Sequence, residues 1–205
     1  MKLYYSPGAC SLSPHIALLE AGLPYDLVKV DLRAKKLENG DDFLQVNPKG
    51  QVPALALDTG EMVTEGPIII QMIADKVADK KLAPARDSNE RYKLLEWLNY
   101  ITTELHKNLG PMFSPVLADD AKAFFKDRAM GKFKYVDSQL AGREYLMGSQ
   151  FTVADGYLFT MIMWAQDRLG FDLSGLPNVT AYKARVAARP KVQEALKKEG
   201  LLKAA

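Results

Sequence analysis

The chain has 205 residues, a length that allows one large domain or two small ones. Hydrophobic residues make up 48% and charged residues 25%, the composition of a folded globular protein and not of a disordered one. The formal net charge is only +2, and basic pairs such as Lys35-Lys36 and Lys197-Lys198 are interleaved with acidic residues. This pattern lacks the concentrated basic stripe of a nucleic-acid-binding protein.

The cellular location is indicated by what the sequence lacks. Residues 1–7 show no apolar core of a signal peptide, and no stretch approaches the ~20 apolar residues of a membrane-spanning helix. Cys10 is the only cysteine, so an internal disulfide is excluded. One cysteine and two histidines, His15 and His106, are too few ligands for a structural zinc cluster. We therefore expect a cytoplasmic protein that binds neither membranes nor nucleic acids.

The first thirty residues predict a strand, a helix and a second strand. Residues 3–5 are apolar and aromatic, and a Ser-Pro-Gly turn ends them. Helical spacing follows over residues 12–23, where Pro14 falls in the first turn and Gly22 provides a stop. Residues 25–30 form the second strand. A strand–helix–strand unit of this length predicts that the two strands are parallel.

The next segment predicts a hairpin and another helix. Residues 32–46 are polar and predict a loop with one short helix. Residues 52–57 and 61–63 predict two strands, and the short Asp58-Thr59-Gly60 turn makes them antiparallel. A helix opens near Glu65 and continues to about residue 77. Together these elements form a small βαβ-ββα domain.

After Leu82-Ala83-Pro84-Ala85 the sequence predicts helices alone. Ser88 is a plausible N-cap, and Thr152 with Asp155 forms a capping box before a very apolar helix. The first expected helix begins at Ser88 and is broken by Pro111 and Pro115, and the second spans about residues 119–140. A third follows Thr152, and two more begin at Pro177 and Pro190. The predicted fold class is α/β followed by all-α.

Cys10 is the first candidate for chemistry. It lies between the first strand and the helix that follows, where unsatisfied amides favour a thiolate. Ligands of open α/β sheets bind at this end of the strands. The alternative is a buried cysteine that acts as a small hydrophobic residue. The position of Cys10 at this end of the first strand favours a role in chemistry over that of a small hydrophobic residue.

Two further motifs are ambiguous when each is taken alone. Pro53 opens a strand just after Pro48-Lys49-Gly50, which suggests a cis peptide bond that presents backbone groups to a ligand, or simply an edge proline. Glu65 and Gly66 stand at a helix start, where an acid and a free amide could bind the ammonium and carboxylate of an amino acid. A favourable acid in a first helical turn explains the same residues.

Taken together, these features resemble the cytosolic glutathione S-transferases, and most closely their bacterial beta class. The resemblance spans essentially the whole chain. It implies a thioredoxin-like glutathione-binding domain over residues 1–81 and an all-helical domain over residues 87–205 that supplies the electrophile pocket. It also implies a homodimer that uses glutathione as co-substrate, without a metal, in detoxification. The motifs that carry it are Tyr5-Ser-Pro-Gly-Ala-Cys10-Ser-Leu-Ser-Pro-His15, Asn47-Pro-Lys-Gly-Gln-Val52-Pro53, Thr64-Glu65-Gly66, Glu96-Trp97-Leu98-Asn99, Glu104-Leu105-His106-Lys107 and Phe151-Thr-Val-Ala-Asp155.

The resemblance also implies roles for individual residues. Cys10 would lie beside the glutathione sulfur and form a mixed disulfide with it, and His106 would approach the same sulfur. These two are the catalytic candidates. His15 receives no such role and is interpreted as structural. The remaining glutathione contacts would be Val52 to the cysteinyl part, Glu65 and Gly66 to the γ-glutamyl end, Lys35 to the glycine carboxylate, Thr103, Glu104 and Leu105 from the helical half, and Asn99 from the other subunit of a dimer.

The sequence departs from the family pattern at one position, and it leaves the activating group open. Many members have Ser after the binding acid, where this chain has Gly66. Tyr4, Tyr5 and Ser11 are further candidates for activating the glutathione thiol. A second cysteine near Cys10 is absent, which excludes a thioredoxin-type dithiol relay.

The implied activity is the addition of the glutathione thiolate to small electrophiles, bound in an apolar pocket formed by residues such as Met112, Phe113 and Trp164. A thiol–disulfide transferase or a reductive dehalogenase is the main alternative. It is distinguished from the conjugating enzyme by whether Cys10→Ser abolishes turnover. A non-enzymatic adaptor is a third hypothesis, tested by retention on immobilised glutathione. No nucleophile-elbow, dinucleotide or phosphate-loop motif supports an unrelated enzyme.

Overall fold

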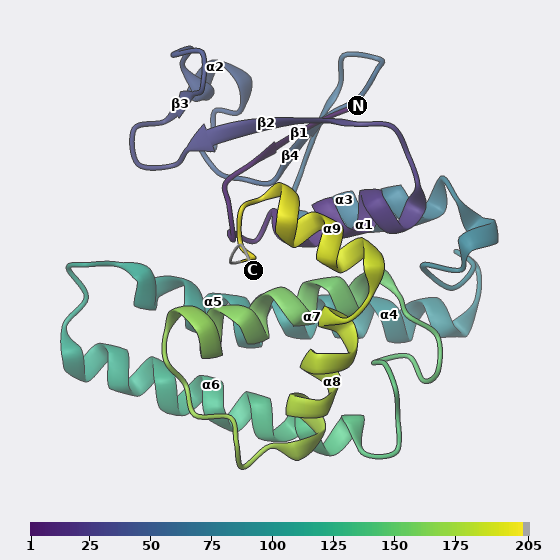
Figure 1. The fold of residues 1–205 in the computed structure, drawn as a ribbon, viewed down its shortest axis with the longest axis vertical. Helices are drawn as coiled ribbons and strands as arrows, with labels where there is room; N and C mark the ends of the chain where they lie inside the picture. The colour runs from purple at the N-terminus through teal and green to yellow at the C-terminus, as the bar shows by residue number, and fades with distance from the viewer. Residues whose placement is uncertain (203–205) are drawn as a thin grey trace. The chain divides into compact units, whose positions relative to one another are not determined.

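The computed structural model describes residues 1–202, which fall into two units of different architecture (Figure 1). The first unit contains residues 1–82 together with the C-terminal segment from residue 189, and the second contains residues 83–188. The first is an α/β unit and the second is helical, which is the expected order of fold classes.

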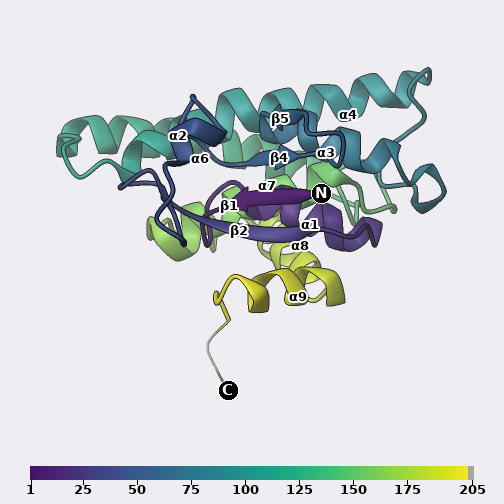
Figure 2. The same ribbon diagram turned by 90° about the horizontal axis from the view of Figure 1, so that it is seen from above.

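A five-stranded sheet forms the centre of the first unit (Figure 2). Its strand order is β3-β2-β1-β4-β5. The pairing of β1 with β2 is parallel, as the strand–helix–strand pattern predicts, and β4 and β5 form the expected antiparallel hairpin. The short β3, paired with β2, lies in a segment predicted as a loop. The strands are β1 (Lys2–Tyr5), β2 (Asp26–Asp31), β3 (Lys36–Leu37), β4 (Ala54–Ala56) and β5 (Met62–Thr64).

Helices α1 (Leu12–Ala21) and α3 (Gly66–Asp75) pack side by side against one face of this sheet (Figure 1). Almost the whole of α1 is buried, and Gly22 ends it in the left-handed conformation with φ of 68°. A glycine adopts this conformation without steric cost, which explains the predicted stop. Two short segments, α2 (Phe43–Val46) and η1 (Ala78–Lys80), complete the unit up to residue 82.

Helix α9 (Pro190–Lys198) packs on α1 and is grouped with the first unit, although it lies in the range 87–205 predicted as the helical domain. Residues 203–205 of that range lie outside the described part of the chain. The physical reason is a set of contacts with the first unit. Val192, Ala195 and Leu196 are buried, and Arg189 forms a two-pronged ion pair with Glu20, at 2.7 and 2.9 Å.

The second unit is built from helices, which begin close to the predicted positions. Ser88 caps the first of them by accepting a hydrogen bond from the amide of Arg91. Helix α7 is buried from Val153 to Ile162 and forms the core of the unit. The elements are α4 (Asn89–Tyr100), η2 (Ile101–His106), α5 (Lys107–Leu109), η3 (Gly110–Phe113), α6 (Asp119–Leu140), α7 (Val153–Met163), η4 (Trp164–Arg168) and α8 (Pro177–Ala187).

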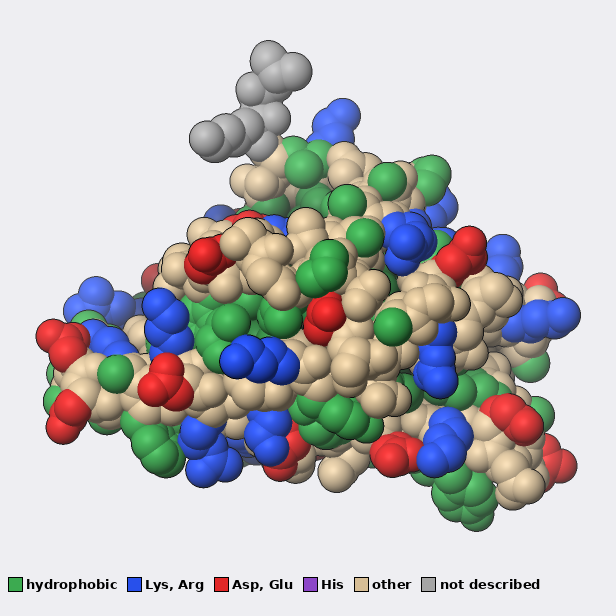
Figure 3. Space-filling view, turned by 90° about the horizontal axis from the view of Figure 1, so that it is seen from below, with side chains coloured by type: hydrophobic (Ala, Val, Ile, Leu, Met, Phe, Trp, Pro, Cys, Tyr) green, Lys and Arg blue, Asp and Glu red, His purple; other side chains and the backbone are tan. Residues whose placement is uncertain are grey.

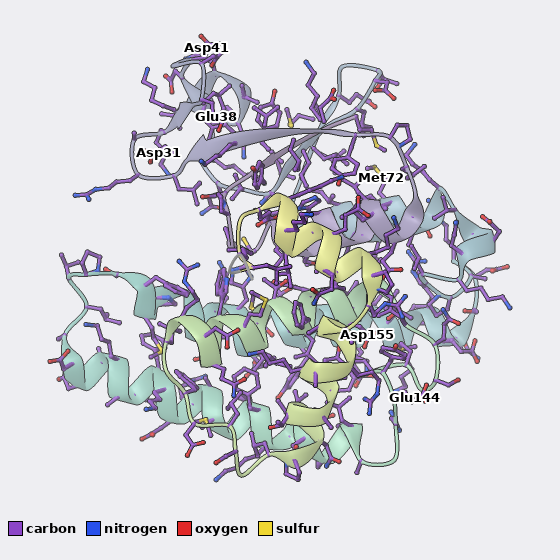
Figure 4. All side chains as sticks on the ribbon, in the orientation of Figure 1. Asp31, Glu38, Asp41, Met72, Glu144 and Asp155 are labelled. Atoms are coloured by element: carbon purple, nitrogen blue, oxygen red, sulfur yellow. The ribbon has the colours of Figure 1, made fainter. Side chains whose placement is uncertain are left out.

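The predicted capping box at the start of α7 is present. The fully buried Asp155 carboxylate accepts hydrogen bonds from the amides of Thr152 and Leu146, at 2.8 and 2.9 Å, and from the Tyr182 hydroxyl at 2.8 Å. Burial raises the pKa of Asp155, although these hydrogen bonds act in the opposite direction. Asp155 therefore joins α7 to α8 in the interior of the second unit (Figure 4).

The charge distribution on the surface and the apolarity of the helices concern the expectation that the chain binds neither nucleic acids nor membranes. On the face shown in Figure 3, Lys and Arg side chains are interspersed with Asp and Glu, and hydrophobic groups lie between them. Within residues 1–202, no helix combines the length and apolarity that a membrane span requires.

Candidate active site

Cys10 lies in the turn that joins β1 to α1, one residue before the N-cap position Ser11. The turn is fixed by hydrogen bonds from the amide of Ala9 to the carbonyl of Ser6 and from the amide of Leu12 to the carbonyl of Ala9, both 3.0 Å. The Cys10 thiol donates to the carbonyl of Val52 at 3.2 Å, and the side chain is partly exposed. Cys10 is therefore a reachable thiol at a helix start, and not a fully buried core residue.

Two alternative activating groups are engaged in local structure. The buried Ser11 hydroxyl accepts from the amide of Ser6 at 3.2 Å and donates to its carbonyl at 3.3 Å. Tyr5 is 8% exposed, and burial together with the nearby Glu199 carboxylate raises the pKa of its phenol. The Ser11 hydroxyl is thus already engaged, and the Tyr5 phenol is largely buried and stays protonated at neutral pH.

A single loop, residues 47–53, shapes the candidate site of the first unit. The peptide bond between Val52 and Pro53 is cis, as predicted. The side-chain amide of the buried Asn47 donates to the carbonyl of Gln51 at 2.8 Å, and the amide of Gly50 donates to the carbonyl of Asn47 at 2.8 Å. The backbone of this loop is therefore held by its own hydrogen bonds.

The 47–53 loop contacts three of the four glutathione-binding residues predicted in the first unit outside the loop itself, and it lies close to the fourth, Gly66. Val52 accepts from the Cys10 thiol, as described above, and the carbonyl of Gly50 accepts from Nζ of Lys35 at 2.7 Å. Nζ of Lys49 lies 2.7 Å from Oε1 of Glu65. Cγ of Pro53 lies 3.6 Å from the position that a Cβ would take on Gly66. The sequence places these residues in separate motifs, and the fold brings them together.

Glu65 has an unusual backbone conformation at the start of α3. Its φ of 67° is positive, which is rare for a residue with a side chain and is typical of functional sites. Its carbonyl accepts hydrogen bonds from the amides of Ile68 and Ile69, both 3.0 Å, while its side chain is 62% exposed. The carboxylate is thus directed toward solvent from a fixed backbone. Its partner Lys49 was not predicted as a site residue.

The predicted residues of the second unit follow one another on α4 and η2. Asn99 and Thr103 are exposed, and the Thr103 hydroxyl donates to the carbonyl of Asn99 at 3.1 Å. Glu104 forms an ion pair with Lys132 at 2.7 Å, and this hydrogen bond is the main reason that the pKa of Glu104 is lowered. Leu105 is fully buried, so only its backbone remains for a ligand contact.

Both η2 and η4 are π-helical turns, which the sequence did not predict. The amide of Lys107 bonds the carbonyl of Thr102, and that of Leu169 bonds the carbonyl of Trp164, each five residues back. Within η2, the Thr102 hydroxyl donates to the carbonyl of Leu98 at 2.7 Å and so competes with backbone amides for that acceptor. π-turns are frequent at functional sites.

His106, at the end of η2, meets Trp164, the first residue of η4. Their ring centroids lie 4.9 Å apart at an interplanar angle of 84°. Nδ1 of His106 lies 2.6 Å from the hydroxyl of Tyr157, and Phe113 packs on Trp164 with a centroid distance of 5.0 Å. The predicted His106, Phe113 and Trp164 thus form one aromatic group, which Tyr157 joins.

Burial, followed by the nearby Lys107 charge, lowers the pKa of His106 to about 4. The imidazole is therefore neutral at neutral pH. When the Tyr157 hydroxyl donates to Nδ1, the ring proton sits on Nε2, which then acts as a hydrogen-bond donor. Sequence reasoning missed Tyr157, although it lies seven residues before Trp164 and so on the same side of a helix.

His15 has the structural role expected for it. It is fully buried, and its Nδ1 lies 2.8 Å from Oε1 of Glu199 while its Nε2 lies 2.9 Å from the hydroxyl of Tyr25. The other Glu199 oxygen accepts from the amide of Gly8 at 2.8 Å. Across residues 1–202, no three His, Cys, Asp or Glu side chains lie close enough together to hold a metal ion.

A thioredoxin-like α/β unit followed by a helical unit defines the class to which the chain belongs. Residues 8–76 match the family described as "Glutathione S-transferase, N-terminal domain", and residues 103–199 match "Glutathione S-transferase, C-terminal domain". The chain is 49% identical over 201 residues to Glutathione S-transferase GstA of Escherichia coli O157:H7, covering 98% of this chain and 100% of the relative. The chain belongs to the glutathione S-transferase family and is a transferase.

Solved structures agree with this assignment. A sphingomonad glutathione S-transferase complexed with glutathione has a TM-score of 0.94 and 48% identity, and covers 98% of this chain and 100% of that chain. A bacterial beta-class enzyme from Sphingomonas chungbukensis has a TM-score of 0.95 and 49% identity over the same shares. The predicted resemblance to the bacterial beta class is confirmed. The roles of the individual site residues remain predictions.

Proposed function

We propose that this chain catalyses the addition of the glutathione thiolate to small electrophiles in the cytoplasm, with glutathione bound along the 47–53 loop. One observation carries the proposal: this loop contacts Cys10, Lys35 and Glu65 and lies close to Gly66. These four are the predicted contacts for the sulfur, the glycine carboxylate and the γ-glutamyl end. Membership of the family and likeness to a glutathione-bound relative support the choice of ligand.

The backbone of the site suits an extended tripeptide. Val52 precedes the cis bond, and its carbonyl already accepts a hydrogen bond, from Cys10. When glutathione binds, we propose that backbone groups of Val52 pair with the cysteinyl residue, as in strand addition. Glu65 then accepts hydrogen bonds from the α-ammonium group, and the amide of Gly66, at the start of α3, donates to the α-carboxylate. Lys35 donates to the glycine carboxylate.

Activation of the sulfur requires donors that favour the thiolate. The amides at the start of α1 and the Cys10 thiol lie in one turn, and oriented dipoles of this kind lower a thiol pKa. We propose that neutral His106 adds a hydrogen bond from Nε2 and not a positive charge, because its own pKa is about 4. The aromatic group of His106, Phe113 and Trp164 supplies apolar surface for the electrophile.

Thiol–disulfide transfer is a second candidate function, favoured by the partly exposed Cys10 thiol. The Cys10 thiolate attacks the glutathione sulfur of a mixed disulfide, which forms a Cys10–glutathione disulfide and releases the other thiolate to take a proton. A second glutathione thiolate then attacks the glutathione sulfur of that disulfide, restores Cys10 and leaves oxidised glutathione. Both steps conserve electrons, and neither needs a second cysteine.

The two functions are separated by measuring turnover of an aryl halide and of a glutathione mixed disulfide by the wild type, Cys10→Ser and His106→Ala. We expect Cys10→Ser to reduce disulfide exchange at least about a hundredfold, because only a thiolate carries that step. Conjugation should fall less in Cys10→Ser, and His106→Ala should lower it about tenfold through the lost hydrogen bond. If wild type and both variants are equally inert with saturating glutathione, the proposed function is wrong.

A further inference from the structure

Lys49 and Glu65 form an ion pair where the γ-glutamyl end of glutathione is proposed to bind. Nζ of Lys49 lies 2.7 Å from Oε1 of Glu65 and donates to the Thr64 hydroxyl at 2.9 Å. The backbone of Lys49 is fixed as well, since its amide donates to Oδ1 of Asn47 at 3.2 Å. An anchored loop thus directs this ammonium group to the carboxylate.

The Glu65 side of the pair is equally well positioned. Its backbone has positive φ and is held at the start of α3 by the bonds from Ile68 and Ile69. The side chains of Lys49 and Glu65 are 52% and 62% exposed, so a ligand can reach the carboxylate without opening the core. The Lys49 ammonium therefore already occupies one oxygen of the carboxylate to which the α-ammonium group of a γ-glutamyl ligand is proposed to bind.

We propose that Lys49 is a resident counterion of Glu65, which competes with the α-ammonium group of glutathione and so limits how strongly the site recognises that group. The inference rests on the proposed glutathione site. Two primary ammonium groups have the same chemistry toward one carboxylate. Binding of glutathione consequently exchanges one exposed ion pair for another. The net gain in binding free energy is therefore smaller than at a carboxylate without a counterion.

The size of the effect follows from the exposure of the pair. Exposed ion pairs shift equilibria by roughly two- to fivefold. Lys49 therefore reduces the preference for a ligand with an α-ammonium group by about this factor. A glutathione conjugate carries the same γ-glutamyl end as glutathione. The competition hence weakens binding of the product as well and favours its release.

The test compares two ligands by isothermal titration calorimetry: glutathione, and glutaryl-cysteinyl-glycine, the same tripeptide without the α-amino group. The proteins are wild type, Lys49→Gln, Lys49→Arg, which keeps the charge, and Lys76→Gln, which removes one positive charge at the far end of α3. Lys76 follows the last residue of that helix, about 15 Å from Glu65. The quantity of interest is the Kd of the analogue divided by that of glutathione, which isolates the α-ammonium group.

We expect this ratio to rise roughly two- to fivefold in Lys49→Gln and to match wild type in Lys49→Arg and Lys76→Gln. An unchanged or smaller ratio in Lys49→Gln overturns the inference. Equal weakening of both ligands gives an unchanged ratio and identifies Lys49 as a direct ligand of a group that they share. Absence of glutathione binding by wild type refutes the proposed function itself, and the inference with it.

Discussion

Gly66 is a position where one added group should strengthen the site. A Cβ there would lie 3.6 Å from Cγ of Pro53, an ordinary contact, and the backbone has no positive φ that would oppose a side chain. We expect Gly66→Ser to lower KM for glutathione roughly two- to tenfold, through one new hydrogen bond to the γ-glutamyl carboxylate. Steady-state kinetics at varied glutathione concentration measures this.

Gly66→Ala is the matched control, because it adds the Cβ without the hydroxyl. It should leave KM unchanged and should not reduce the free energy of unfolding. An equal fall of KM in both variants would show that backbone restriction, and not the hydroxyl, is responsible.

His106 should make stability depend on pH in a defined window. Its pKa of about 4 in the folded chain lies below the ordinary value near 6.5, so between these values the unfolded chain binds a proton that the folded chain does not. Stability therefore rises with pH across this window and is lost as pH falls through it. We expect a loss of about 2 kcal/mol between about pH 7.5 and about pH 5 from this group.

Urea unfolding of wild type and His106→Gln at both pH values measures this contribution. The variant should have a pH-dependent loss that is smaller by about 2 kcal/mol, because glutamine does not titrate. Identical losses in the two proteins would mean that His106 is not desolvated in the folded chain.

At the level of elements, helix α9 should be held to the first unit chiefly by Glu199, just after its last residue. The buried Glu199 carboxylate accepts from His15 and from the amide of Gly8, at 2.8 Å each. Glu199→Ala leaves both buried groups without this acceptor, so we expect a loss of roughly 3–5 kcal/mol in the free energy of unfolding. Because Gly8 lies two residues before Cys10, activity should also fall at temperatures where the protein remains folded.

Glu194→Ala is the control for the Glu199 variant. Glu194 lies on the same helix, but its ion pairs with Lys191 and Lys198 are on the surface. Chemical unfolding should show little change for this variant. Equal destabilisation of both variants would contradict the role given to the buried carboxylate.

The starts of helices were the structural features best predicted from the sequence, because capping residues and prolines act within the first turn. Ser88 caps α4 within its own first turn, and Pro177 and Pro190 begin α8 and α9. The features that were missed depend on contacts distant in sequence. Strand β3 exists only through its pairing with β2, and α9 leaves the helical unit because Glu199 bonds His15, 184 residues earlier.

The same distinction holds for the site. Cys10, Val52 and Glu65 could be proposed as site residues because each belongs to a recognisable motif. Lys49 also lies in such a motif, but its pairing with Glu65 depends on how the 47–53 loop meets the start of α3. Tyr157 has the helical spacing that places it on the side of Trp164, but its contact with His106 and the π-turns depend on packing inside the helical unit, for which the sequence carries no local signal.

For the whole molecule, we propose that two copies associate through the aromatic surface of α4 and α6. Tyr92 and Tyr135 are 70% and 45% exposed, and Trp97 packs on Tyr135 with a centroid distance of 6.2 Å. Asn99 lies on the same helix as Tyr92. Exposed aromatic clusters of this kind are typical of protein interfaces.

Sedimentation equilibrium should give twice the chain mass of 22.8 kDa for wild type. Tyr135→Lys should raise the dissociation constant at least about tenfold, because it places a charge in an apolar contact. Lys134→Glu, a charge change at the neighbouring exposed position, serves as the control and should have a smaller effect. A monomeric wild type would contradict the proposed association.

The central claim is that glutathione binds along the 47–53 loop of the first unit. A crystal structure of the complex with reduced glutathione tests it most directly. We expect the sulfur beside Sγ of Cys10, the cysteinyl backbone paired with Val52, and the α-ammonium group at the carboxylate of Glu65. Glutathione bound elsewhere, or density for it that contacts neither Cys10 nor Glu65, would contradict the claim.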